Sequence, residues 1–129
     1  MVYLRHMTLN RSLVLAACLA GALSVALGAF AAHGAGPAIK TLLTTGSHYL
    51  VVHALLALAC AGLPLRDRLV ILAGWLALIG GLVFCLSLAA IGWTGVTALG
   101  MVTPIGGVLM IAAWLLLAFA AFGRRTDVA

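Results

Sequence analysis

Residues 69–123 read LVILAGWLALIGGLVFCLSLAAIGWTGVTALGMVTPIGGVLMIAAWLLLAFAAFG, a stretch without Asp, Glu, Lys or Arg. A helix rises about 1.5 Å per residue, so about 20 residues cross the roughly 30 Å hydrocarbon core of a bilayer. The stretch is far too long for one crossing and must fold back on itself. The break lies between Trp93 and Pro104, because Thr103 suits an N-cap and Pro104 suits the first position of a new helix.

The composition of the whole chain agrees with a lipid environment. Of 129 residues, 66% are hydrophobic and 7% are charged, whereas soluble domains carry about 25% charged residues. Two more apolar stretches precede Pro64. The sequence therefore predicts an all-α integral membrane protein, a single domain over residues 1–129 with four transmembrane helices in an antiparallel bundle. The predicted spans are residues 12–32, 46–63, 69–92 and 104–122.

The basic residues indicate an orientation. Four spans place both termini on one side, which carries six of the seven basic residues: Arg5, Arg11, Arg66, Arg68, Arg124 and Arg125. The other side carries only Lys40. Because cytoplasmic segments are enriched in Lys and Arg, both termini are predicted to be cytoplasmic, with the loop at 34–45 and the turn at 93–102 facing outward. Charges at the edges of apolar stretches indicate topology, so we expect no nucleic-acid partner.

The N-terminal segment has an alternative interpretation as a cleavable signal peptide. Its arginines, its apolar run and the sequence Ala29-Phe30-Ala31 are compatible with one. The uncharged run from Ser12 to Ile39 is, however, much longer than the roughly 7–15 residues of a signal-peptide core. Cleavage would also leave three spans, whereas the charges fit four. We expect the first span to be retained.

Small residues at helical spacing predict where the helices pack. In lipid, membrane helices associate through small residues that let backbones approach closely. One such stripe in the first span holds Ala17, Gly21, Ser24 and Gly28. The predicted packing glycines are Gly21, Gly28, Gly74, Gly81, Gly106 and Gly107. Single cysteines within apolar runs are interpreted as buried structural residues: Cys18, Cys60 and Cys85.

The second span holds the densest group of polar side chains. Tyr49 and His53 are four residues apart and share a helix face, with Thr45 above and Cys60 below. His48 points about 140° away from His53.

His33, at the end of the first span, completes a candidate polar site with Tyr49 and His53 in the outer half of the membrane. These side chains either bond helix to helix or bind a ligand. Haem is disfavoured because His53 lies about 10 Å deeper than His33 by helical rise. A structural metal is disfavoured because no carboxylate or nearby thiolate completes the ligands. We predict no catalytic residue, no metal and no cofactor.

Several motifs together carry a resemblance to a known family. They are Gly28-Ala29-Phe30-Ala31-Ala32-His33-Gly34, Tyr49 with His53, and Thr103-Pro104-Ile105-Gly106-Gly107 followed by Trp114. In order and spacing, the chain resembles domain-of-unknown-function family four-two-three, the YgdD/YwdK-like small membrane proteins. It is also similar to the eukaryotic transmembrane-protein-two-five-six group. The resemblance implies a four-helix membrane protein of unknown function. The third span departs from the family pattern, since Phe84–Ala89 lacks its glycine and tyrosine.

These observations lead to one functional expectation and one alternative. We expect a non-enzymatic structural or accessory subunit of the bacterial inner membrane, surrounded by the lipid bilayer and present as a homo-oligomer or in a larger membrane complex. The alternative is a module that binds or transports a small molecule, lipid or quinone through the outer-leaflet region of His33, Tyr49 and His53.

Overall fold

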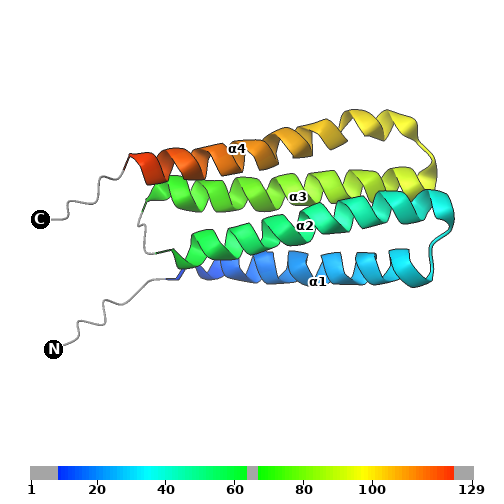
Figure 1. Cartoon of the computed structure of the whole chain (residues 1–129), viewed down its shortest axis with the longest axis horizontal. Helices are drawn as coiled ribbons and strands as arrows, with labels where there is room; N and C mark the ends of the chain where they lie inside the picture. The colour runs from blue at the N-terminus through cyan, green and yellow to red at the C-terminus, as the bar shows by residue number, and fades with distance from the viewer. Residues whose placement is uncertain (1–8, 64–66, 124–129) are drawn as a thin grey trace, which may run out of the picture.

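A computed structural model describes residues 9–63 and 67–123. It contains four long helices, α1 (Arg11–His33), α2 (Pro37–Gly62), α3 (Arg68–Thr94) and α4 (Thr103–Phe122), and a short 3-10 helix, η1 (Thr97–Met101), before α4. Successive long helices run antiparallel, so the start of α1 and the end of α4 lie at the same end of the molecule (Figure 1). All four are long and apolar enough to cross a membrane. The predicted four-helix fold is confirmed.

Local sequence explains where several helices begin and end. The Asn10 side chain accepts a hydrogen bond from the Leu13 amide and caps α1, and Asp67 caps α3 by accepting from the Leu69 amide. Gly95 ends α3 with a φ of 70°, a left-handed conformation that glycine adopts without a steric penalty. Such caps satisfy backbone groups that helix ends leave without partners.

Two predicted boundaries are wrong. The outer loop predicted at 34–45 is only three residues long, because Pro37 starts α2 at a position where its missing N–H costs no hydrogen bond. The polar residues after it therefore form the first turns of a helix. Thr103 is also not an N-cap. It is the first residue of α4, and its hydroxyl lies 2.7 Å from the Ser87 hydroxyl of α3 instead of capping its own helix.

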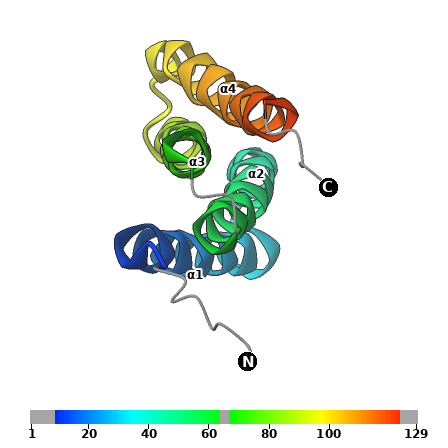
Figure 2. The same ribbon diagram turned by 90° about the vertical axis from the view of Figure 1, so that its left-hand side faces the viewer.

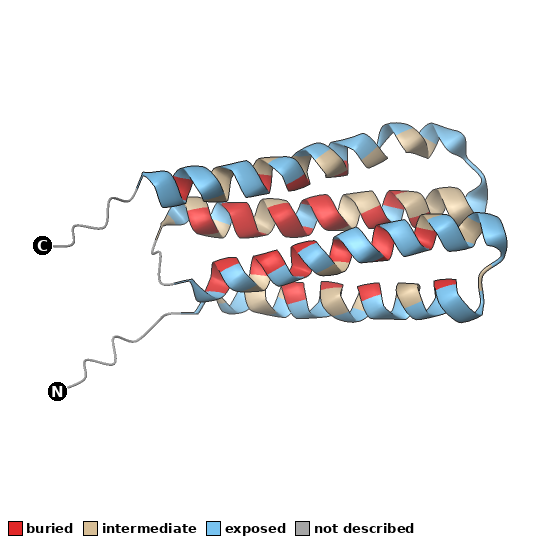
Figure 3. Cartoon of the chain, viewed as in Figure 1, coloured by how far each residue is buried: buried red, intermediate tan, exposed pale blue. Residues whose placement is uncertain are grey.

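The helices form a row rather than a closed square. Helices α2 and α3 form the centre, α1 packs mainly against α2, and α4 packs against α3 and η1. Seen along the bundle, α1 and α4 lie on opposite sides (Figure 2). The buried residues accordingly concentrate on α2 and α3, while the outer faces of α1 and α4 are exposed (Figure 3). Those outer faces carry large apolar side chains, including Leu19 and Phe119, as expected of a surface in contact with lipid.

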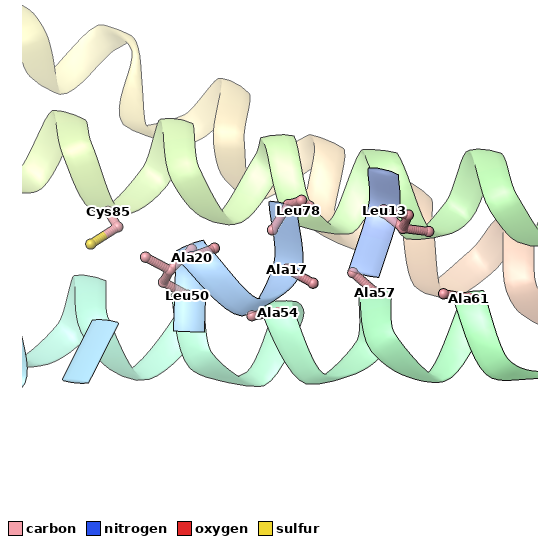
Figure 4. Close-up of a cluster of buried hydrophobic side chains, with 9 residues drawn as sticks. All are labelled: Leu13, Ala17, Ala20, Leu50, Ala54, Ala57, Ala61, Leu78 and Cys85. Atoms are coloured by element: carbon pink, nitrogen blue, oxygen red, sulfur yellow. The ribbon is translucent and has the colours of Figure 1, made fainter. Parts of the chain in front are cut away.

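The core is built mainly from small side chains. One buried cluster joins α1, α2 and α3 (Figure 4). Alanine dominates it, and its members are Leu13, Ala17, Ala20, Leu50, Ala54, Ala57, Ala61, Leu78 and Cys85. Cys60 is buried as predicted, but Cys18 is exposed on α1, which corrects that part of the cysteine prediction. The small side chains allow the helix backbones to come close together.

Four of the six predicted packing glycines face a neighbouring helix. A Cβ added at Gly74 would lie 3.0 Å from the Cβ of Cys60, and one at Gly81 would lie 3.4 Å from the Cβ of His53, so both face α2. Gly28 faces Ser47 of α2, and Gly106 faces α3.

The other two predicted glycines do not pack within the chain. Gly21 and Gly107 have no atom within 4 Å of an added Cβ, so neither contacts a neighbouring helix among the described residues. Sequence reasoning also missed Gly46, which faces Cys85, and Gly80, which faces α4. The reason is geometric: each stripe shows which residues share a face, but the row of helices decides which faces are covered.

The closest backbone contact joins α3 and α4. A Cβ added at Gly106 would lie 2.5 Å from the Phe84 nitrogen and 2.7 Å from the Gly80 oxygen. A Cβ added at Gly80 would in turn lie 2.9 Å from both the Gly106 oxygen and the Met110 nitrogen. Since all these neighbours are backbone atoms, no side chain can rotate to make room, and the two helices require glycine at both positions.

We therefore predict that alanine substitutions at two adjacent glycines differ in their effect on stability. Gly106→Ala should force α4 away from α3 and lower stability by about 1–3 kcal/mol, the usual cost of overpacking. Gly107→Ala should leave stability unchanged or slightly raised, because its Cβ enters open space. Thermal unfolding of both variants in the same detergent compares them directly. Equal melting temperatures for the two would contradict the packing described here.

Candidate functional site

The candidate site is built on one face of α2. Because Tyr49 and His53 are separated by one helical turn, their rings lie one above the other, with centroids 6.4 Å apart. His53 is only 4% exposed and points between the helices, whereas Tyr49 is 46% exposed at the edge of the bundle. The structure thus brings two of the three predicted residues together.

Both ring nitrogens of His53 have a hydrogen-bond partner. Nδ1 lies 2.7 Å from the Tyr49 carbonyl oxygen, one turn earlier in α2, and the indole Nε1–H of Trp114 in α4 donates to Nε2 over 3.0 Å. A carbonyl only accepts and an indole N–H only donates. The partners therefore assign His53 as the neutral tautomer with its proton on Nδ1, and leave neither nitrogen available to a metal or a substrate proton.

Aromatic rings surround this hydrogen-bonded pair. The Trp114 ring meets the His53 ring edge-on, with centroids 6.1 Å apart. The Tyr49 ring packs edge-on against Phe84 of α3 at 5.1 Å. Such edge-to-face arrangements are favourable because the positive ring edge meets the negative ring face. Helices α2, α3 and α4 are thereby joined through side chains in one small region.

A groove of about 380 Å³ lies beside these rings, between α2 and α4, with Phe84 of α3 also lining it. Gly107 leaves part of this space open because it has no side chain. The lining is mostly apolar, with the polar atoms of three aromatic residues, and consists of Tyr49, His53, Phe84, Gly107, Met110, Ile111 and Trp114. Ile111 and Trp114 are about half exposed, which indicates that the groove opens sideways at the surface of the bundle.

His53 lies deeper than the sequence predicted. Since α2 begins at Pro37, His53 is sixteen residues, or about 24 Å, from the start of the helix and about 14 Å from Gly62 at its end. The sequence prediction of about 10 Å depth was wrong because it started the helix at residue 46. The site is therefore near the middle of the bundle's length and not in its outer part.

His33 is not part of this site. It is the last residue of α1, is exposed, and lies at the end of the bundle near the Phe30–Trp93 ring pair, whose centroids are 5.9 Å apart. His48, which the sequence placed on another face of α2, is exposed on that face beside α1. Thr45 is also exposed, and Cys60 packs against Gly74.

Trp114 is the residue that sequence reasoning did not assign to the site. Trp114 and Gly107 are seven residues apart, a spacing that puts both on one face of α4, and this face lines the groove. No sequence signal identified His53 as the partner of the indole, because the pairing depends on how α4 packs against α3.

The described residues offer few groups for chemistry. Within residues 9–63 and 67–123, no three His, Cys, Asp or Glu side chains lie close enough together to hold a metal ion. The buried serine hydroxyls donate to carbonyls of their own helices, Ser24 to Gly21, Ser47 to Thr44 and Ser87 to Phe84. The site is therefore a neutral, hydrogen-bonded aromatic cluster beside an apolar groove.

Comparison with known proteins decides the family. Residues 27–107, from the last part of α1 to the start of α4, match the family described as "Protein of unknown function (DUF423)". The chain belongs to the DUF423 family. This confirms the resemblance seen in the sequence motifs.

The relatives that this DUF423 chain matches carry the name UPF0382 membrane protein. A UPF0382 membrane protein from Haemophilus influenzae is 38% identical over 91% of this chain and 98% of its own length. UPF0382 membrane protein YwdK from Bacillus subtilis is 38% identical over 77% of this chain and 86% of its own. UPF0382 membrane protein SAB0533 from Staphylococcus aureus is 34% identical over 78% and 86%. No solved structure matches the chain. The DUF423 chain is thus a membrane protein of a family without an assigned function.

The hydrogen bond between α2 and α4 yields a test. Trp114→Phe keeps an aromatic ring but removes the donor and leaves Nε2 of buried His53 without its partner. We predict a loss of about 0.5–2 kcal/mol in stability, the range for hydrogen bonds between membrane helices. Trp93→Phe is the matched control, because Trp93 is exposed at the end of α3. Thermal unfolding in lipid nanodiscs measures both variants, and equal losses would contradict a specific role for the Trp114 indole.

Proposed function

We propose that this protein is a non-enzymatic structural or accessory subunit of the bacterial inner membrane, with both termini in the cytoplasm. The observation that carries the proposal is the use of its polar side chains at membrane depth. His53, the most buried histidine of the described residues, uses one ring nitrogen for a hydrogen bond within its own helix and the other for a hydrogen bond to Trp114. A side chain that joins two helices serves the assembly of the bundle, and in this arrangement neither ring nitrogen of His53 is free to act as a general acid or base.

Within the described residues, the buried serines and cysteines lack an activating base, which supports a non-enzymatic role. A nucleophilic Ser or Cys requires an adjacent base that a third group orients. In the described residues, Ser24 and Ser87 donate to backbone carbonyls, and Cys60 and Cys85 pack against glycines on facing helices. Each of these side chains acts as part of the helix packing.

The charge distribution supports the orientation. Arg11 and Arg68 begin α1 and α3 at one end of the bundle, and Lys40 lies in the first turn of α2 at the other. The remaining four arginines lie outside the described residues, and the sequence prediction assigns them to the same side as Arg11 and Arg68. Six basic residues on one side and one on the other favour a cytoplasmic location for the side with six.

A second candidate function is the binding of a small molecule, lipid or quinone. The groove between α2 and α4 favours it, because a volume of about 380 Å³ lies within the range of ligand pockets and a few polar groups adjoin an apolar lining. Tyr49 and His53 would form this site, with Trp114 in place of the more distant His33. The structural role ranks first because His53 already has its hydrogen-bond partners inside the protein.

The orientation has a direct test. Reporter domains inserted after Gly36 and after Gly95 should be active outside the cytoplasm, because these positions lie in the connections at the end of the bundle opposite to Arg11. A reporter at the C-terminus should be active inside. The insertion sites lie between helices and should leave the spans intact. A reversed pair of reporters would contradict the proposed orientation.

The functional proposal predicts what accompanies the purified protein. Extraction from native membranes in mild detergent should yield the chain together with another protein chain, either a second copy or a different membrane protein. Mass spectrometry of the same preparation distinguishes the second candidate. A small molecule retained by the wild type and lost in Tyr49→Phe, with unchanged melting temperature, would favour ligand binding. A strictly monomeric particle would contradict the accessory role.

A further inference from the structure

Polar side chains line the junction of α1 and α2: Ser24 and Ser47 are buried in it, whereas Thr44 and His48 are exposed beside it. Ser24, Thr44, Ser47 and His48, with Val25 and Val51, line a shallow groove of about 240 Å³. The Ser24 and Ser47 hydroxyls donate to carbonyls of their own helices, Gly21 and Thr44. His48 is exposed, and within residues 9–63 and 67–123 no hydrogen bond to its ring is found; its neighbour is the edge of the Tyr49 ring.

His48 lies at membrane depth. Gly28 of α1 faces Ser47 of α2, so His48 is level with about residue 27 of the antiparallel α1. It is therefore about 9 Å from His33 at one end of α1 and about 24 Å from Arg11 at the other. Both ends of α1 together span about 33 Å, close to the hydrocarbon thickness. An imidazole facing acyl chains at this depth lacks the hydrogen-bond partners that water would supply.

The surface next to His48 also permits close approach of another helix. Gly21 has no atom within 4 Å of an added Cβ, although the sequence marks it as a packing glycine, and Val25, one turn later, is 68% exposed. Polar side chains in membrane helices normally face another helix, and small residues mark the positions where backbones approach. Within the described residues, no other helix covers the exposed His48 or fills the space at Gly21.

We propose that the accessible part of this α1–α2 face, defined by Gly21, Val25, Thr44, His48 and Val51, is the interface with a second copy of the chain. The inference rests on the proposed structural role and names the partner. Copies inserted in the same orientation are related by a two-fold axis along the membrane normal, and such an axis keeps every residue at its own depth. His48 then meets His48 and Thr44 of the second copy.

The chemistry of the face is self-complementary. A neutral imidazole and a hydroxyl each donate and accept hydrogen bonds, so two identical faces can satisfy one another without opposite charges. Because the two-fold axis keeps every residue at its own depth, the second copy supplies these hydrogen-bond partners at the depth where they are needed. A different membrane protein would need polar groups placed independently at the same depth, and acyl chains offer none.

Crosslinking in native membranes tests the interface while His48 is retained. In a background with all three cysteines replaced by alanine, Val51→Cys places one thiol on the α1–α2 face. Val108→Cys places one on the far helix α4, where Val108 is 64% exposed. Oxidation should give a disulfide-linked dimer for Val51→Cys and monomer for Val108→Cys. Equal crosslinking of the two, or none for Val51→Cys, would overturn the proposal.

A second variant tests the role of the imidazole. His48→Leu should lower the association constant of the chain in lipid vesicles by about threefold to tenfold, the effect of losing a hydrogen bond between membrane helices. Because His48 is exposed, the melting temperature should not change. Single-molecule photobleaching measures the dimer fraction, with Val108→Leu as the control. An unchanged dimer fraction, or a disulfide to a different protein, would overturn self-association through this face, whereas the accessory role would survive the second result.

Discussion

The close backbone contact of α3 with its two neighbours is the constraint on which the structure depends. Lipid is as apolar as leucine, so burial of large side chains gives membrane helices little reason to associate. Helix α3 instead presents Gly74 and Gly81 to α2 and Gly80 to α4. Two adjacent glycines thus serve two different interfaces, because successive residues on a helix are about 100° apart. The row of helices follows from this arrangement.

The row in turn determines what the polar residues do. Because α2 and α4 pack on neighbouring faces of α3, the Trp114 indole lies within reach of His53. These two side chains connect the two helices that pack against α3. The same geometry leaves a groove between α2 and α4 and an uncovered α1–α2 face with His48. Within the described residues, both ring nitrogens of His53 have hydrogen-bond partners, whereas none is found for His48. This difference separates a residue that holds the fold from one that is available to a partner.

Much of the fold follows from the sequence, because hydrophobic length and the positions of Arg and Lys decide how many helices cross a membrane. The start of α2 does not follow from the sequence. Lys40 and the threonines after it are typical of a loop, but Pro37 begins a helix there. The pair Tyr49 and His53 follows from helical spacing. Trp114 as their partner and the separation of His33 depend on the order of helices in the row, which small-residue stripes on single helices do not reveal. For the same reason, Gly106 and Gly107 look equivalent in sequence but differ in structure.

The central claim is that a neutral His53 joins α2 to α4 near the middle of the bundle. Nitrogen-15 NMR of histidine-labelled protein in lipid bilayers, assigned with a His53→Gln variant, tests it most directly. The account predicts a protonated Nδ1, an unprotonated Nε2 and a through-space correlation between Nε2 and the indole proton of Trp114. A proton on Nε2, or no correlation with Trp114, would contradict it.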